Sequence, residues 1–516
     1  MKKSIADILL FVISAVLIFN YIPYFFRSKF IVGVLSAHLV VYPLIIWIVY
    51  TLYCQYKYKN VFVSFGKFRK FLALYICIHI VSALWGAYIY PYYDVALNTP
   101  IEQIPKLDKL LKFVNSMGLV IDDKFAIKLW LVAKPLKSVF IDTLYTFGGA
   151  YMVYCWYYND WQKGIMVIIK GLLVGVCIVC ACSVIEVFYL ADNVTAKHIL
   201  EFITPYFHPI KIRQDWWPPL LWKGQLRSVF PEPSHIGNYI ALSMPVLWYL
   251  YLRNESKRIL YLSCMLTFFV FLTNARTAYA MLFGMLVLLP MLLIYAKRVD
   301  LLKKTICIFF ACAVAFGMNI AFVNYQSSIK TVTAVESLDK NLVSLASSDK
   351  RSNGARYGLI KANLRIAADY PILGVGSGLS SAYIIDYFTE NEKKNREINS
   401  WVKNQNRNGV LSMNYSVNDA MNEYVTRIAQ NGVLGLSIFL FPFILVIVKL
   451  FKLVRYYKGN KQLDVLLILF TLINCMVAGC NGSLNLIYSV WLILGIAYAI
   501  VYSDKYCLID DEEREN

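Results

Sequence analysis

Residues 227–235 read RSVFPEPSH and bring an arginine, a carboxylate and a histidine to the start of an apolar run. Prolines on both sides of Glu232 keep it out of a helix, and Ser234 is placed to cap the helix that follows. A carboxylate held there can accept a proton from a hydroxyl group, and His235 in the first turn is a second candidate base or proton relay. Two plainer interpretations stay open: Glu232 pairs with a neighbouring arginine, and His235 makes a structural hydrogen bond.

Three arginines in different segments have the chemistry to hold phosphate. Arg227 leads RSVFPEPSH, Arg276 lies in the tight turn NART between two apolar runs, and Arg356 begins RYGLIKANLR. A guanidinium group is always charged and can contact two phosphate oxygens at once. A diphosphate on a lipid anchor would lie at the depth of such turns. The alternative for Arg276 is that its side chain reaches the lipid headgroups.

The segment around Arg356 is predicted to be a helix. Arg356 and Arg365 then face opposite sides, since nine steps of about 100° leave half a turn. The side that Arg356 borders is predicted to be apolar, with Tyr357, Ile360, Leu364 and Ala367. We therefore expect Arg356 to face the membrane site and Arg365 to be solvated.

Two further polar motifs follow along the chain. Asn422, Glu423 and Arg427 lie at helical spacing in NEYVTRIAQNG, and they are candidate supporting residues. If the pair Glu423–Arg427 is exposed, it contributes only tenths of a kcal/mol. The run GVGSG at 374–378 lacks the lysine and the strand–helix setting of a phosphate loop, so it predicts a flexible turn or backbone amides near an anion.

The elements that must position these residues are predicted to be membrane helices. The chain has 516 residues, of which 59% are hydrophobic and 16% are charged, whereas soluble domains carry about 25% charged residues. Apolar runs of about 20 residues, enough to cross the hydrocarbon core, recur about twelve times. They predict an all-α polytopic membrane protein with spans near 5–26, 30–53, 69–90, 136–158, 164–190, 234–252, 257–273, 277–295, 304–323, 432–453, 463–480 and 484–502.

The distribution of positive charge predicts the topology. Basic residues concentrate in alternate turns, such as YKYKNVFVSFGKFRK and KLFKLVRYYKGNK, which places both termini in the cytoplasm. The same turns account for much of the net charge of +19, so we expect no nucleic-acid partner. The predicted organisation is nine spans within 1–323, outer loops at 91–135 and 191–233, a large outer loop at 324–431, three spans within 432–503 and an acidic cytoplasmic tail at 504–516.

The outer segments collect the unusual polar residues, and that co-location predicts a site on the outer face. A short amphipathic helix is expected within 104–119. Trp216 and Trp217 could stack on sugar rings or anchor the chain at the interface. The cysteines of CIVCAC (177–182) lie in an apolar run without added polar ligands, so we interpret them as packing residues and expect no metal.

Together these features resemble the O-antigen polymerase and ligase superfamily of bacterial envelope glycosyltransferases. The matching stretches are RSVFPEPSH, TNARTAYAML, ARYGLIKANLRIAADYPILGVGSG and NEYVTRIAQNGVLGLSIF, which lie within about 220–450. The resemblance implies a GT-C-like, metal-independent inner-membrane enzyme without a cofactor. Its substrates would be oligosaccharides on undecaprenyl diphosphate, with arginines on the leaving diphosphate and a base on the acceptor hydroxyl. By motif it implicates Arg227, Glu232, Arg276 and Arg356. A chain-length regulator and a flippase are candidate partners.

One departure separates two branches of that superfamily. Ligases usually carry His-Asn where this chain has Met421-Asn422, and EPS at 232–234 also differs from their asparagine–proline pattern. We therefore expect a repeat-unit polymerase, with ligase as the alternative, and His235, His198 and His208 remain outer-side substitutes for the missing histidine. A lipid-linked oligosaccharide flippase is a third possibility, but no inverted halves are evident in the sequence.

Overall fold

The computed structural model describes residues 2–28, 36–59, 61, 66–208, 224–327, 351–408, 420–484 and 490–503. Within these ranges every regular element is a helix. The first half contains α1 (Lys2–Val16), η1 (Tyr24–Phe26), α2 (Val41–Tyr58), α3 (Gly66–Tyr88), α4 (Tyr93–Leu97), η3 (Ile101–Gln103), α5 (Pro105–Ser116), α6 (Asp123–Thr143), the π-helical η4 (Leu144–Gly148), α7 (Gly149–Tyr157), α8 (Trp161–Leu190) and α9 (Val194–Phe207). The second half contains α10 (Ser234–Asn254), α11 (Lys257–Leu272), α12 (Arg276–Tyr295), α13 (Val299–Ser327), α15 (Arg351–Asp369), α16 (Ser380–Tyr383), α17 (Glu390–Lys393), α18 (Arg396–Asn408), α19 (Glu423–Tyr456), α20 (Gly459–Ala478) and α21 (Val490–Val501).

Six of these helices are long and apolar enough to cross a membrane, which supports a multi-pass membrane protein. They lie at Phe68–Tyr88, Trp161–Leu190, Arg276–Tyr295, Val299–Gln326, Glu423–Tyr456 and Gly459–Ala478. Shorter apolar helices at Ser4–Val16 and Val490–Val501 overlap two more of the expected spans. The count of twelve therefore stays a prediction. The acidic tail at 504–516 lies outside the described residues.

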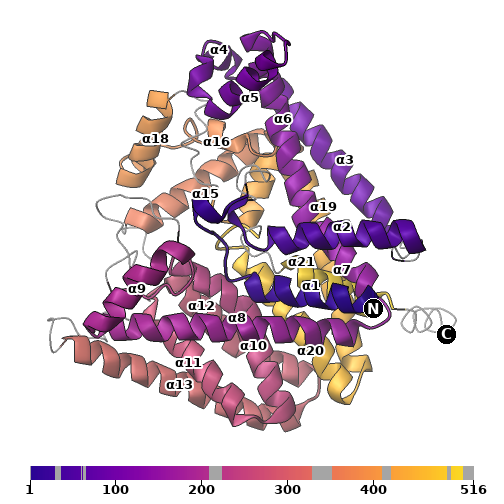
Figure 1. Ribbon diagram of the computed structural model, residues 1–516, viewed down its shortest axis with the longest axis vertical. Coiled ribbons are helices and arrows are strands. Elements are labelled where there is room, and N and C mark those ends of the chain that lie inside the picture. The colour runs from indigo at the N-terminus through magenta and orange to yellow at the C-terminus, as the bar shows by residue number, and fades with distance from the viewer. Residues whose placement is uncertain are drawn as a thin grey trace.

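The long helices pack into one bundle with a continuous apolar core. Within it α1 packs on α8, α7 on α21, α11 on α13, and α10 on both α12 and α20. The N-terminus lies on the right of Figure 1, whereas α9, α15 and α18 lie on the left. The predicted topology also puts the N-terminus and these three helices on opposite sides of the membrane. Which side is cytoplasmic stays a prediction.

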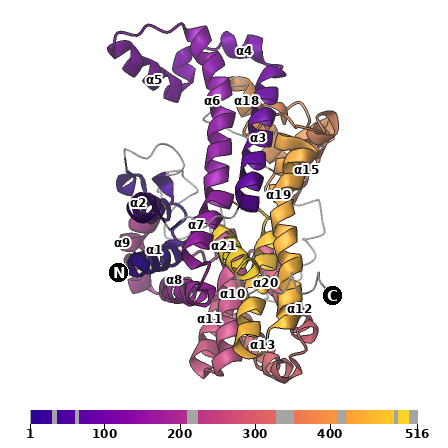
Figure 2. The same cartoon turned by 90° about the vertical axis from the view of Figure 1, so that its right-hand side faces the viewer.

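Two of the predicted outer segments share a second, smaller apolar core. It joins Leu107 and Leu111 of α5 and Ile127 and Leu131 of α6 to residues of α15, α16 and α18. Figure 2 shows α4 and α5 at the top of the molecule, beyond the ends of α3 and α6 and away from α10, α11 and α13. The helix expected within 104–119 is confirmed as α5. The segment expected as a loop to residue 135 is instead helical from Asp123, and it continues through η4 into α7.

A break in α19 joins this second core to the bundle. Gly432 has φ 64° and ψ −171°, outside the helical region, and a Cβ atom there would lie 2.1 Å from the backbone oxygen of Ile372. The backbone N–H groups of Val375 and Gly376 donate to the carbonyls of Ala429 and Gln430 at 3.1 and 2.8 Å. The run 374–378 therefore docks in the opened turn of α19, and two of its amides are used there rather than presented to an anion.

Candidate functional site

The RSVFPEPSH segment is fixed to α8 by a buried acid. Glu186 is 2% exposed, and its Oε2 accepts hydrogen bonds from the backbone N–H groups of Arg227 at 2.9 Å and Ser228 at 2.8 Å. The Ser228 hydroxyl donates to the backbone oxygen of Val179 at 2.9 Å. Sequence reasoning missed Glu186, although a single acid inside a long apolar run is itself a signal, because buried charges require partners.

Arg227 lies in a setting that differs from the expected phosphate clamp. It is 6% exposed, and burial lowers its pKa to about 10, while the charge of Glu186 opposes that change. His208, at the end of α9, lies on the other side, where its ring Nε2 and the Ser228 carbonyl are 3.1 Å apart. Arg227 is therefore enclosed between α8 and α9, and its guanidinium stays charged at neutral pH.

The candidate base, Glu232, is exposed at the start of α10. The prediction that Ser234 caps this helix is wrong: the cap position is Pro233, in helical geometry at φ −55° and ψ −35°, and no side chain caps the helix. The Ser234 hydroxyl lies 3.5 Å from the Glu232 carboxylate instead. His235 lies in the first turn as expected, and its Nδ1 is buried with no hydrogen-bond partner among the described residues.

The structure brings Arg276 and Arg356 within electrostatic range of each other, although 80 positions separate them in the chain. Arg276 begins α12, and Arg356 lies in α15, half-buried, with its Nη1 3.5 Å from Oδ1 of Asn481. The start of α10 lies beside the start of α12. A Cβ on Gly237 would be 2.9 Å from the Cα atom of Ala278, two residues after Arg276. Two like charges thus lie in the region where α12, α15 and the turn after α20 converge.

The α10 residue nearest that turn was not identified from the sequence. The amide nitrogen of Asn238 would lie 3.9 Å from a Cβ on Gly482, directly after Asn481. Its Oδ1 is buried and has no hydrogen-bond partner among the described residues. Since His235 and Asn238 are three residues apart, they lie on neighbouring faces of α10. Their unpartnered atoms are polar contacts that a hydroxylated ligand could satisfy.

The prediction for the apolar face of the Arg356 helix holds at one residue and fails at two. Ala367 is buried, at 7% exposed, whereas Tyr357 and Leu364 are 41% and 46% exposed. Other buried apolar residues of α15 include Ala355, Leu359, Ala362 and Ile366. The helix packs on α19 and α18, and those neighbours, which its own periodicity does not reveal, select the buried side.

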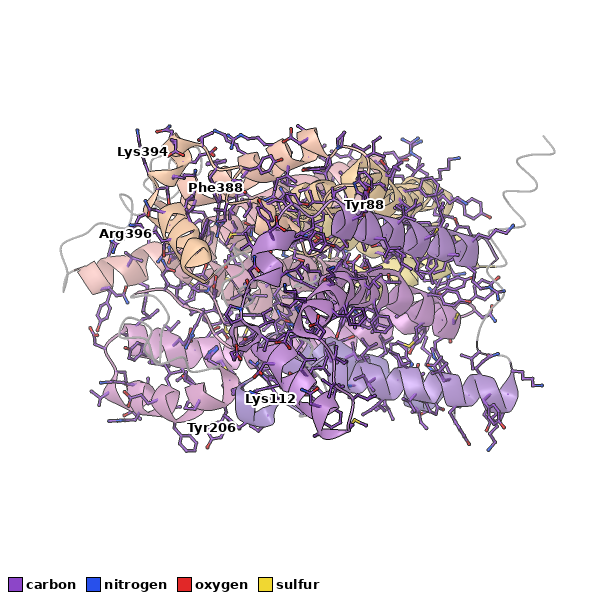
Figure 3. The ribbon with its side chains drawn as sticks, turned by 90° about the horizontal axis from the view of Figure 1, so that it is seen from above. Tyr88, Lys112, Tyr206, Phe388, Lys394 and Arg396 are labelled. Atoms are coloured by element: carbon purple, nitrogen blue, oxygen red, sulfur yellow. The ribbon has the colours of Figure 1, made fainter. Side chains whose placement is uncertain are left out.

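Arg365 is partly solvated as predicted, with a side chain 38% exposed, but it is also paired. Its Nη1 and Nη2 donate to the two carboxylate oxygens of Glu392 at 2.8 and 2.9 Å, and Nη1 also donates to the Tyr387 carbonyl at 2.8 Å. This bidentate pair fixes the segment that follows α16 to α15. Figure 3 shows Phe388, Lys394 and Arg396 of this region at one edge of the molecule.

The pair Glu423–Arg427 is buried, with side chains 5% and 7% exposed, so the small contribution given for an exposed pair does not apply. Arg427 Nε donates to Glu423 Oε1 at 2.5 Å, and its two terminal nitrogens donate to the oxygens of Asp142 at 2.6 and 3.0 Å. The Tyr75 hydroxyl also donates to Asp142, and the Arg427 guanidinium lies 3.7 Å from the centre of the Phe439 ring. We call Asp142, Glu423, Arg427 and Tyr75 the buried network.

Asn422 has a defined structural role at the same helix start. Its Oδ1 accepts from the backbone N–H groups of Tyr424 and Val425, each at 3.1 Å, so it caps α19. Its Nδ2 donates to the carbonyl of Cys480 at 3.1 Å. The supporting position predicted for Asn422 thus corresponds to a cap that also holds the turn after α20.

No described group of three or more His, Cys, Asp or Glu side chains is placed to hold a metal ion. The described cysteines are all free thiols, and Cys180 of the CIVCAC run packs in the bundle core. His198 of α9 is exposed beside Glu201, with 3.6 Å between Nδ1 and Oε2. Trp216 and Trp217 lie outside the described residues.

Comparison with known families adds one finding. Residues 260–440 match the family model described as O-antigen ligase. The match supports the O-antigen polymerase and ligase superfamily and a role in polysaccharide assembly, and it does not distinguish the two activities. No curated protein matches the chain.

The matched region contains one half of the candidate site. Arg276, Arg356, Glu423 and Arg427 lie inside residues 260–440, whereas the RSVFPEPSH segment and Asp142 lie outside. The structure connects the two parts, because α10 contacts α12 and Arg427 contacts Asp142. The half of the site with the arginine pair is thus the half that the O-antigen ligase family model describes.

Proposed function

We propose that this protein polymerises undecaprenyl-diphosphate-linked oligosaccharide repeat units on the outer face of the bacterial inner membrane. A hydroxyl of one repeat unit attacks the anomeric carbon of a glycan on a second carrier. The new glycosidic bond forms as the bond to the diphosphate breaks, and the hydroxyl proton passes to a base. The reaction needs no cofactor or metal in this mechanism.

The observation that carries the proposal is that α12, α15, the turn after α20 and the start of α10 converge, which brings Arg276 and Arg356 within electrostatic range of each other. Two positive charges in a partly buried setting repel each other, so a dianionic ligand between them is strongly favoured. Negative charge grows on the departing diphosphate, and guanidinium groups already in place stabilise the transition state more than the ground state. We assign Arg276 and Arg356 to the diphosphate, and Arg227, enclosed beside Glu186, to holding the loop.

Glu232 is the proposed base, because it is an exposed acid two residues before α10, the helix whose Gly237 lies beside Ala278 near the α12 arginine. His235 and Asn238 would hydrogen-bond the acceptor sugar through their unpartnered buried atoms. The second apolar core, which joins α5 and α15, would cover the site and exclude water, which limits hydrolysis. A flippase and a chain-length regulator are the proposed partners.

Polymerisation is favoured over ligation by one residue. The position before Asn422 holds Met421, where ligases usually carry histidine. Ligation to a lipid acceptor remains the alternative function, because the family match covers both activities.

The test is made in the native host with Arg276→Ala and Glu232→Gln, with protein level and surface glycan measured together. Arg365→Ala is the matched control, because it removes an arginine that is paired inside the loop. We expect a single repeat unit on the gel for the first two variants and a full ladder for the control. Long lipid-linked polymer with no surface glycan would indicate ligase instead, and unchanged ladders in both site variants would refute the assignment.

A further inference from the structure

The buried network has no role in the chemistry above, yet it lies in the apolar interior at a high energetic cost. The side chains of Arg427, Glu423 and Asp142 are 7%, 5% and 13% exposed. Removing charges from water costs several kcal/mol for each ion, and pairing offsets this only when the geometry is good. Two acids on one arginine, with Tyr75 bridging Asp142 and Arg427, meet that condition.

The network extends to the turn after α20 through the second oxygen of Glu423. Glu423 Oε2 accepts from the backbone N–H of Leu484 at 2.8 Å, and the Glu423 backbone N–H donates to the carbonyl of Gly479 at 2.8 Å. The Asn422 side chain adds a third contact, to Cys480. The cap and the first residue of α19 therefore hold residues 479–484 at both ends, through Gly479 and Cys480 at one end and Leu484 at the other.

That turn presents Asn481 to the diphosphate site. Asn481 Oδ1 lies 3.5 Å from Nη1 of Arg356, the arginine that approaches Arg276. A guanidinium contacts a diphosphate well only in one orientation, since its donors lie in a rigid plane. Contacts thus lead without a gap from Asp142 through Arg427, Glu423 and the turn to Arg356.

We propose that Asp142 and Arg427 are positioning residues for the diphosphate site, and that they act through Glu423 and the 479–484 turn on the orientation of Arg356. The inference rests on the proposed function in one respect, namely that Arg356 binds the diphosphate. Neither residue touches substrate in this scheme.

The experiment measures binding of undecaprenyl diphosphate to the full-length protein in nanodiscs. The variants are Asp142→Asn, Asn481→Ala and the double variant. Asp464→Asn is the matched control: its side chain is 4% exposed and pairs with Arg253 at 2.9 Å, near the opposite ends of α10 and α20. We expect each single site variant to raise the Kd roughly tenfold, a size typical of coupled neighbours. The Kd of the double variant should be no higher than the higher Kd of the two single variants. The Kd of the control should stay within about twofold of the wild-type value.

A general loosening of the bundle would not make the effects of Asp142→Asn and Asn481→Ala on the Kd non-additive. Independent effects of Asp142→Asn and Asn481→Ala, or an equal loss in Asp464→Asn, would overturn the inference. Arg356→Ala distinguishes failure of the proposed function from failure of the positioning role. If Arg356→Ala leaves binding unchanged, the proposed function fails. If Arg356→Ala weakens binding and Asp142→Asn does not, only the positioning role is overturned. If Asp142→Asn does not accumulate, Tyr75→Phe makes the same test, because it removes only the hydroxyl that bridges Asp142 and Arg427.

Discussion

Loss of the Glu186 carboxylate should release the RSVFPEPSH segment from α8. The two backbone N–H groups that it accepts, at 2.9 and 2.8 Å, belong to Arg227 and Ser228, which are 6% and 4% exposed. A hydrogen bond to a charged group contributes about 1.5–3 kcal/mol. Two bonds at the lower figure give about 3 kcal/mol, so Glu186→Ala should raise the open population of the segment roughly hundredfold.

Hydrogen exchange followed by mass spectrometry on peptides within 224–233 measures that population directly, since these amides exchange only when the segment opens. Glu186→Gln is the control, because an amide oxygen can accept the same two bonds with little change in shape. We expect exchange to be roughly hundredfold faster in Glu186→Ala and faster by an intermediate factor in Glu186→Gln, because a neutral amide oxygen keeps both hydrogen bonds without the charge. Equal exchange in Glu186→Ala and wild type would refute the reasoning, and so would equally fast exchange in the two variants.

Three further predictions follow from other parts of the molecule. Burial, and to a smaller extent the charge of Arg227, holds the pKa of His208 well below 6.5 in the folded protein. The unfolded chain takes up the proton near pH 6.5, so the stability falls as the pH drops below that value, by at most about 1.4 kcal/mol per pH unit. His208→Gln should therefore make the melting temperature less dependent on pH between pH 7 and 5. Gly432→Ala should lower protein accumulation severely, by about 3 kcal/mol or more of stability, since a Cβ would lie 2.1 Å from the Ile372 oxygen, whereas Gly284→Ala, with nothing within 4 Å, should be tolerated. A photocrosslinking residue in place of Phe113, which is 62% exposed on α5, should label lipid, and labelling of protein alone would show that α5 does not contact the bilayer.

The sequence was sufficient to predict helices and was insufficient wherever a partner lies far along the chain. Apolar runs predicted the long helices, and the amphipathic pattern predicted α5. The pair Glu423–Arg427 was recognised from its spacing, but its burial depends on Asp142, which lies 285 residues earlier. The prediction of which side of α15 is buried failed at Tyr357 and Leu364 for the same reason, because the neighbouring helices determine that side. Glu186 is different, because its position in an apolar run already indicated a buried partner.

The break in α19 bears on the choice between an enzyme and a transporter. Transporters use broken helices to expose backbone groups to a cavity, where those groups bind substrate or ions. Here the opened carbonyls of Ala429 and Gln430 accept from Val375 and Gly376, and the N–H of Val433 donates to the carbonyl of Pro371 at 2.8 Å. The exposed backbone is thus already satisfied by the segment after α15. The break fixes the helix that carries Arg356 against the bundle. A site with stationary charges requires such a fixed helix, whereas a moving gate would have to break these hydrogen bonds.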